Sequence, residues 1–377
     1  MDPSTEHWLL RLKRIITFLL KRNENDFGRL ARHKLLSERN KKKLLSLAYR
    51  AYPTLDWKSY LNKFTGLKMK NITTELTVVL HILSQEIQDE KNFQIKSPKK
   101  IPITEHKFDW NLVFVAVFKN EAARLSEWLD FHITLGVEHF FLYDNESEDN
   151  YREVLAPYLA KGVVTLKKAS NLPEDPHFEW AMRRAYEDAR VALREKACWV
   201  MFLDLDEFVF TLNEEALPQF LENYREYPGL SINWYNFGTS GIQELLPGEL
   251  QTLKVIHRFP DEHFHNNHIK TISQIRYVES CGLHNVVFKD GLISIDTEQH
   301  PIPDNLNLYR PTNKIRINHY WMRSEGNRER KFQRITYQYY ASLSPEQRDK
   351  IHFNRNEVVD TKIIPLVTKM LNRRVHS

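Results

Sequence analysis

The amino-acid sequence predicts an α/β fold in which helices flank a mostly parallel sheet, preceded by an all-helical region and followed by further helices. Two observations predict this fold class. Between residues 112 and 210, short apolar runs alternate with longer segments of helical spacing. Polar clusters follow three of the apolar runs, as is typical at the carboxyl ends of parallel strands, where such sheets bind ligands.

The predicted sheet can be justified element by element along the chain. The expected order is a strand over 112–118, a helix that ends at Gly136, a strand over 137–143, a helix through 154–159 that ends at Gly162, a strand over 163–166, a helix over 178–196 and a fourth strand that begins at Cys198. Strands joined by helices of this length imply parallel pairing with right-handed crossovers.

The fourth strand runs into Phe202–Phe210, which reads FLDLDEFVF. If the strand continues through this segment, Asp204 and Asp206 point to one face and Leu205 points away, because side chains alternate along a strand. Two convergent carboxylates are oxygen ligands that suit Mg²⁺ or Mn²⁺ carrying a diphosphate. The alternative is a buried strand that ends in a solvated acidic turn.

Two other polar clusters follow earlier strands. Lys119–Glu121 comes directly after the first predicted strand, and Asp144–Ser147 comes after the second. Because the carboxyl ends of parallel strands share one edge of the sheet, both clusters should meet Asp204 and Asp206 there.

These segments resemble a known group of enzymes. Phe114–Gly162 resembles the opening of nucleotide-sugar glycosyltransferases of the GT-A fold, particularly family 92 and related bacterial enzymes of the family 2 type. FLDLDEFVF resembles their Asp-X-Asp strand, and Ser231–Gly241 resembles their Trp-x-x-Phe-Gly-Ser-x-Gly stretch. Ile317–Tyr320 resembles a later family landmark, so the resemblance covers about residues 110–335.

The resemblance implies a binding pocket for a nucleotide sugar. Asp144 and its neighbour Asn145 would contact the nucleoside, and Asn120 and Glu121 would line the same pocket. Lys270 could meet phosphate or sugar oxygens, with an ordinary surface lysine as the alternative.

The resemblance also implies a divalent cation, Mn²⁺ or Mg²⁺, on the donor diphosphate. Asp204 and Asp206 would hold it, and His319 would be a third ligand. A cation in this position stabilises the negative charge that develops on a departing nucleoside diphosphate.

The implied reaction is the transfer of a hexose from a nucleotide sugar, with UDP as the expected nucleotide, to a hydroxyl of a glycan or surface polysaccharide precursor. The resemblance implies inversion, which requires a general base on the acceptor hydroxyl. Asp261, Glu262 and Glu244 are the candidates, and a solvated surface carboxylate is the alternative for each.

Two other classes of function stay open. The chain could be a non-catalytic binding or scaffold protein of the same fold. It could also be a phosphoryl-transfer hydrolase that uses Asp204 and Asp206 as nucleophile and acid. In such hydrolases the pair follows the first strand, whereas here it follows about the fourth and precedes Glu207.

The chain divides by composition into a helical basic region with a linker over 1–108, the GT-A-like domain over 109–335 and a C-terminal helical segment over 336–377. Residues 1–50 carry 13 Lys and Arg against 5 Asp and Glu, although the whole chain has a net charge of only +5. Within this region, the spacing of residues 8–22 predicts a basic amphipathic helix that suits an anionic membrane surface or packing on its own domain. No nucleic-acid-binding motif accompanies the modest basic surplus, so nucleic acid is not an expected partner.

The cysteine count and the hydropathy bear on location. Cys198 and Cys281 give no disulfide framework, and no run of 18 apolar residues predicts a membrane-spanning helix. We therefore expect a cytoplasmic protein, with peripheral contact at the inner face of a membrane as an alternative.

Overall fold

The computed structural model describes part of the chain, and all structural statements below concern that part. It comprises residues 98–103, 106–169, 178–261, 263–302, 305–307, 309–334 and 356–376. The amphipathic segment over 8–22 and nearly all of the basic region lie outside the described residues. Among the helices that the structure describes, none is both long enough and apolar enough to cross a membrane.

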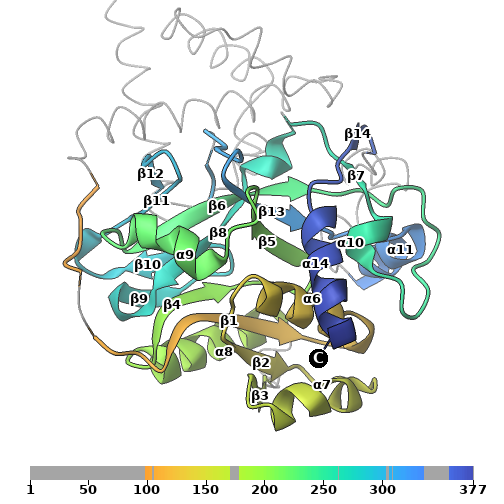
Figure 1. The fold of residues 1–377 in the computed structure, drawn as a ribbon, viewed down its shortest axis with the longest axis horizontal. Coiled ribbons are helices and arrows are strands. Elements are labelled where there is room, and N and C mark those ends of the chain that lie inside the picture. Colours follow the sequence, from red (N-terminus) through yellow and green to blue (C-terminus); the bar gives the residue numbers. More distant parts are fainter. Residues whose placement is uncertain are drawn as a thin grey trace, which may run out of the picture. The chain divides into compact units, whose positions relative to one another are not determined.

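A ten-stranded, mostly parallel sheet forms the centre of the fold (Figure 1). Its first half confirms the predicted alternation, because β1 (Trp110–Phe118) pairs in parallel with both β2 (His139–Asp144) and β4 (Ala197–Phe202). β3 (Val164–Lys168) adds to β2, also in parallel. The strands that precede the three polar clusters therefore run in the same direction, with β1 at their centre.

The second half of the sheet brings a distant segment to the aspartate turn. β8 (Ile269–Gln274) lies antiparallel between β4 and β6 (Gly229–Asn236). β13 (Ile315–His319) pairs in parallel with β6 and antiparallel with β5 (Glu207–Thr211). Because the register places His319 opposite Glu207, the end of β13 lies beside the turn that carries Asp206.

The remaining elements are short strands and the helices that surround the sheet. The short strands are β7 (His257–Arg258), β9 (Val278–Cys281), β10 (Val286–Phe288), β11 (Ser294–Ile295), β12 (Pro301–Ile302) and β14 (Val358–Val359). The α-helices are α6 (Ala122–Thr134), α7 (Tyr151–Ala160), α8 (Phe178–Leu193), α9 (Leu217–Leu221), α10 (Gln251–Lys254), α11 (Glu325–Arg334) and α14 (Ile364–His376), and the 3₁₀ turns are η1 (Glu222–Tyr224), η2 (Phe264–Asn267), η3 (Ile275–Tyr277) and η4 (Lys289–Gly291).

β1 is buried on both faces, which explains its continuous apolar run. Leu112 and Phe114 pack into the core that includes α6 and α7. Val113 and Val115 pack into a second core that includes α8. The helices before β2 and β3 end as predicted, at Gly136 and Gly162, which adopt the positive φ angles of +90° and +69° that glycine tolerates.

One predicted strand is wrong in a way that changes the site. β4 ends at Phe202, and the chain turns before β5 begins, with the N–H of Glu207 donating to the carbonyl of Asp204 at 3.0 Å. Asp204 and Asp206 therefore lie in a turn and do not share a strand face. The turn replaces a continued strand because β5 pairs with β13, away from the parallel half of the sheet.

The described part of the C-terminal segment, residues 356–376, contributes side chains to the same core as the sheet. Within the predicted helical segment over 336–377, Val358–Val359 instead form β14, which pairs with β7, and α14 begins at Ile364. α14 lies against α6 (Figure 1), and its Leu366, Val367 and Met370 are buried. Asp360, just before α14, is also buried and pairs with Arg316 of β13 at 2.6 Å.

Candidate active site

Loops after β1 and β2 form one side of the predicted rim. Asn120 adopts a positive φ of 56°, donates its N–H to Ser147 Oγ at 2.9 Å, and accepts the N–H of Glu148 on its side-chain oxygen at 2.8 Å. Asn145 donates its backbone N–H to the carbonyl of Phe118 at 2.8 Å. These bonds join the ends of the two strands, so the predicted residues Asn120 and Asn145 lie in one connected structure.

Asp144 closes β2 and is buried. Its carboxylate accepts the hydroxyl of Tyr151 at 2.8 Å and the N–H of Ser147 at 2.9 Å. The side-chain amide of Asn145 donates to the carbonyl of Ala169, which follows β3. In the structure both side chains shape the acidic turn.

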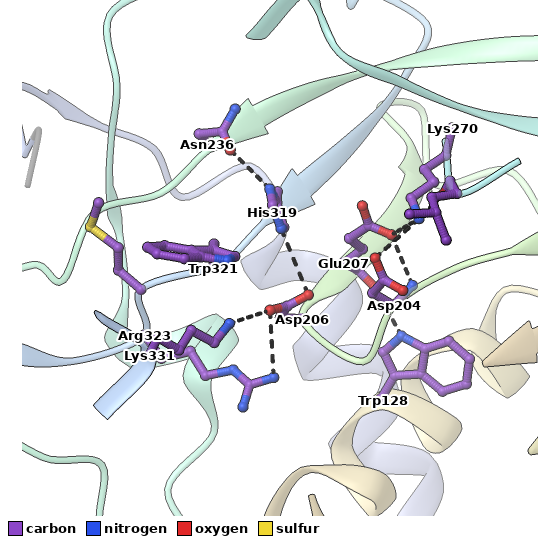
Figure 2. Close-up of polar contacts among 12 residues, drawn as sticks. Trp128, Asp204, Asp206, Glu207, Asn236, Lys270, His319, Trp321, Arg323 and Lys331 are labelled. Carbon is purple, nitrogen blue, oxygen red and sulfur yellow. Dashed lines mark hydrogen bonds and ion pairs between the residues drawn. The ribbon is translucent and has the colours of Figure 1, made fainter. Parts of the chain in front are cut away.

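Asp204 faces a buried lysine. Lys270 of β8 lies with its ammonium 3.0 Å from Asp204 and 2.8 Å from the carbonyl of Leu283, and only 1% of the lysine side chain is exposed (Figure 2). Glu207 lies 3.5 Å from the same ammonium and accepts the backbone N–H of Asp204 at 2.8 Å. The Tyr186 hydroxyl approaches Asp204 at 3.4 Å. Asp204 therefore has its polar partners within the protein, and together they form the Asp204 cluster, although 30% of the Asp204 side chain is exposed.

Burial sets the ionisation of this cluster. It raises the pKa of Glu207 well above its usual range, although Lys270 opposes the shift. Burial alone would lower the pKa of Lys270, but Asp204 and Glu207 outweigh it and raise that pKa. The charged ammonium of Lys270 therefore pairs with Asp204, beside the fully buried Glu207.

Asp206 faces a different set of partners. Its carboxylate lies 2.8 Å from the Lys331 ammonium, 3.9 Å from the Arg323 guanidinium and 3.7 Å from Nε2 of His319 (Figure 2). Burial alone would raise the pKa of Asp206, but the charges of Lys331 and Arg323 hold it well below its usual range. Asp206 is therefore a permanent anion with cations on one oxygen.

His319 presents a lone pair to the other oxygen of Asp206. Its Nδ1 lies 2.9 Å from the amide oxygen of Asn236, so Nδ1 carries the proton. Burial lowers the pKa of His319 to about 3, which keeps the ring neutral and Nε2 unprotonated. Asn236 is itself held by the side chain of Asn266 at 3.2 Å. A histidine fixed by a hydrogen bond on its far nitrogen is the arrangement typical of a metal ligand.

The geometry fits a divalent cation in part. Two acceptors, Nε2 of His319 and Oδ1 of Asp206, face each other at 3.7 Å, and an ion between them would relieve their repulsion. Mg²⁺ and Mn²⁺ often take one or two protein ligands and complete their coordination with substrate phosphates and water. Across the described ranges, no three His, Cys, Asp or Glu side chains form a metal-binding group. The structure thus brings together two of the three predicted ligands, and Asp204 is turned towards Lys270.

Arg323 joins the site to the start of α6. Its guanidinium holds Glu121, the residue before α6, with bonds of 2.9 and 2.6 Å to the two carboxylate oxygens. Arg323 is buried and has a positive φ of 58°, an uncommon conformation for a long side chain. It connects the predicted donor-pocket residue Glu121 to Asp206 across the rim.

The candidate bases lie in less specialised surroundings. Glu244 has a side chain that is 49% exposed and pairs with Arg330 at 2.6 Å. Asp261 is 67% exposed and pairs with Arg258 at 2.7 Å. Glu262 lies outside the described residues. The identity of the general base therefore stays a prediction.

Three residues of the site were missed at the level of sequence: Arg323, Lys331 and Asn236. The first two follow the Ile317–Tyr320 landmark in a stretch rich in basic residues, WMRSEGNRERK, and that stretch was the available signal. Asn236 lies in the Ser231–Gly241 motif, but only the pairing of β6 with β13 brings it beside His319.

Known proteins resemble this chain over the region just described. Residues 115–359 match the family model described as Glycosyltransferase family 92. A family 92 glycosyltransferase protein from Oryza sativa subsp. japonica is 27% identical over 192 residues, which cover 48% of this chain and 31% of that protein. Galactan beta-1,4-galactosyltransferase GALS3 from Arabidopsis thaliana is 24% identical over 176 residues, which cover 46% of this chain and 33% of that protein. The chain spans about a third of the length of these curated relatives.

Solved structures give weaker matches. The match to a structure of S. aureus TarS with UDP is 15% identical, covers 44% of this chain and 47% of that chain, and has a TM-score of 0.29. The family model matches more than half of the chain, and the matched residues include the second half of β1, both aspartates and His319. The chain belongs to glycosyltransferase family 92.

Proposed function

We propose that the protein is a metal-dependent glycosyltransferase that moves a hexose from a UDP-linked donor to a hydroxyl of a glycan or surface polysaccharide precursor. The observation that carries this proposal is the pair of Asp206 and His319. A permanent carboxylate and a neutral imidazole face each other at the carboxyl ends of the parallel strands. Family membership supports the reaction class, and the name of the Arabidopsis relative supports a hexose and a glycan acceptor.

Asp206 and His319 would hold Mn²⁺ or Mg²⁺ in this proposal. The cation would supply positive charge to the leaving diphosphate as the bond to the sugar breaks. Asn236 keeps the coordinating nitrogen of His319 unprotonated, since it occupies the other ring nitrogen. The Asp204 cluster holds the opposite side of the turn in place through Lys270.

The donor would lie along the rim made by the loops after β1 and β2. Asn120, Glu121, Asp144 and Asn145 remain its predicted binding residues, joined by the hydrogen bonds that shape both loops. Arg323, fixed by Glu121, adds a positive charge beside the position proposed for the diphosphate. Inversion is part of the proposal, with the base predicted among Asp261, Glu262 and Glu244.

Calorimetric titration with UDP, GDP and CDP, each with Mn²⁺ and with EDTA, tests the proposal. We expect UDP to bind only with Mn²⁺, and Asp206→Asn to lose this binding while circular dichroism shows an intact fold. Equal UDP binding in EDTA would contradict the metal dependence. Tight binding of another nucleotide would change the proposed donor but keep the glycosyltransferase class. If the folded protein bound no nucleotide, a scaffold role would be favoured.

A further inference from the structure

Lys331 is the closest cation to Asp206, and it differs from the other lysine of the site. Its ammonium lies 2.8 Å from Oδ2 of Asp206 and 5.0 Å from the ring centre of Trp321 (Figure 2). The Lys331 side chain is 24% exposed, whereas that of Lys270 is 1% exposed. Lys331 can therefore move into solvent, but Lys270 is enclosed between Asp204 and the carbonyl of Leu283.

Arg323, the second cation on Asp206, is also fixed. It holds both oxygens of Glu121, is buried, and reaches Asp206 only at 3.9 Å. Of the three cations described around the two aspartates, Lys331 is thus the one with a single strong ionic partner and access to solvent.

A divalent cation on Asp206 would compete directly with Lys331. Both would draw on the same carboxylate, and the ammonium would repel an ion held between Asp206 and His319. A nucleoside diphosphate that arrives with the ion brings new oxygens, which form strong charge-assisted hydrogen bonds with ammonium groups. The ammonium then has a better partner than a carboxylate already bound to metal.

We propose that Lys331 is a displaceable counter-ion: it neutralises Asp206 before the donor binds, and it moves to the diphosphate when metal and nucleotide occupy the site. This inference rests on the proposed function. It gives Lys331 opposite effects on two ligands, because the same side chain opposes the metal alone and favours the nucleotide with metal.

Electron paramagnetic resonance titration with Mn²⁺ alone, without nucleotide, tests the first effect. We expect Lys331→Met to bind Mn²⁺ about tenfold more tightly than the unchanged protein. Calorimetry with UDP at saturating Mn²⁺ tests the second effect, and there the same variant should bind UDP about tenfold more weakly. Lys331→Arg keeps the charge and should stay within about threefold of the unchanged protein in both titrations.

Arg330→Met is the matched control. Arg330 lies next to Lys331 on α11 and carries the same charge, but it pairs with the exposed Glu244 at 2.6 Å. Its loss removes one positive charge from the helix without touching Asp206, so we expect both affinities to change less than about twofold.

The outcomes separate this inference from the proposed function. Equal Mn²⁺ affinity in Lys331→Met and the unchanged protein would overturn the displaceable counter-ion and leave the glycosyltransferase proposal standing. Weaker binding of both ligands would also overturn it, because Lys331 would then be a positioning residue for Asp206. No binding of Mn²⁺ or UDP by any folded variant would overturn both proposals.

Discussion

Asp204 and Asp206 are separated by one residue, yet their carboxylates meet opposite surroundings. Asp204 faces a lysine that is 1% exposed and a fully buried Glu207. Asp206 faces an accessible lysine, an arginine and a neutral imidazole. The first set of contacts is complete within the protein, whereas the second places two acceptors against each other and a displaceable cation beside them.

The difference shows how one short turn can serve both stability and binding. A buried ion pair is costly to break because the remaining partner stays charged in a medium of low dielectric. Lys331 has a side chain that is 24% exposed and can exchange partners through solvent, whereas Lys270 is enclosed. The Asp204 cluster can therefore anchor the turn while Asp206 remains free to change ligands.

The largest expected effect is the loss of metal-dependent binding in Asp206→Asn. The amide keeps the size of the side chain but removes the charge that would hold the cation, so UDP affinity with Mn²⁺ should fall at least about a hundredfold. Calorimetry measures this change, and thermal unfolding checks that the fold persists. Unchanged UDP affinity in the presence of Mn²⁺ would show that Asp206 does not have the metal-binding role that distinguishes it from Asp204.

Lys270→Met should act mainly on stability. It leaves the fully buried Glu207, and Asp204 with a side chain that is 30% exposed, without their cation, at a cost of about 3–5 kcal/mol in the free energy of unfolding. Lys331→Met is the comparison, with a smaller expected loss of about 1–2 kcal/mol, because Lys331 is partly exposed and Arg323 stays 3.9 Å from Asp206. Urea denaturation of both variants measures the contrast, and equal losses would show that the two halves of the turn do not differ in this way.

Asp360→Asn tests a structural carboxylate that lies away from the turn. Asp360 pairs with Arg316 and Arg258, and although burial opposes the shift, these partners lower its pKa to about 2. We expect a loss of about 3 kcal/mol in stability without a change in UDP affinity. The pair stabilises the protein fully above the ordinary pKa of an aspartate, so this contribution should disappear as the pH falls from about 4 towards 2. Weakened UDP binding would show that the two regions are coupled.

Mild acidification should have the smallest effect, and the effect on stability should be the same for His319 of the site as for His132 of the core. Burial lowers the pKa of His319 and of the core residue His132 to about 3 each. The unfolded chain binds protons on both residues near pH 6.5, so each should cost about 1 kcal/mol of stability between pH 6.5 and 5.5. Because His319 stays neutral when folded, Mn²⁺ affinity should change less than about threefold between pH 7.5 and 6. A steep loss of affinity near pH 6.5 would indicate a protonated His319.

The parallel half of the fold could be predicted because its signals are local. The apolar runs of β1, β2 and β4 and the glycines that end α6 and α7 each act within a few residues. The turn at Asp204 could not be predicted this way, because the pairing of β5 with β13 joins segments about a hundred residues apart. The apolar residues of β5 read as a continuation of β4 until that pairing is known.

In the site too, features that depend on local sequence could be predicted, and contacts between distant segments could not. The three rim clusters were found because each follows its own strand. The partners that distinguish the two aspartates, Lys270, Lys331 and Arg323, come from distant elements, and no local pattern relates them to the turn. The sequence therefore indicated the acids and the histidine, but the roles of the cations required the three-dimensional arrangement.

Crystallography of the protein with Mn²⁺ and UDP, with anomalous scattering recorded at the manganese edge, tests the central claim most directly. The account predicts one manganese peak between Asp206 and His319, with Lys331 moved to the diphosphate and Lys270 still paired with Asp204. A peak on Asp204, or UDP bound while Lys331 remains on Asp206, would contradict it.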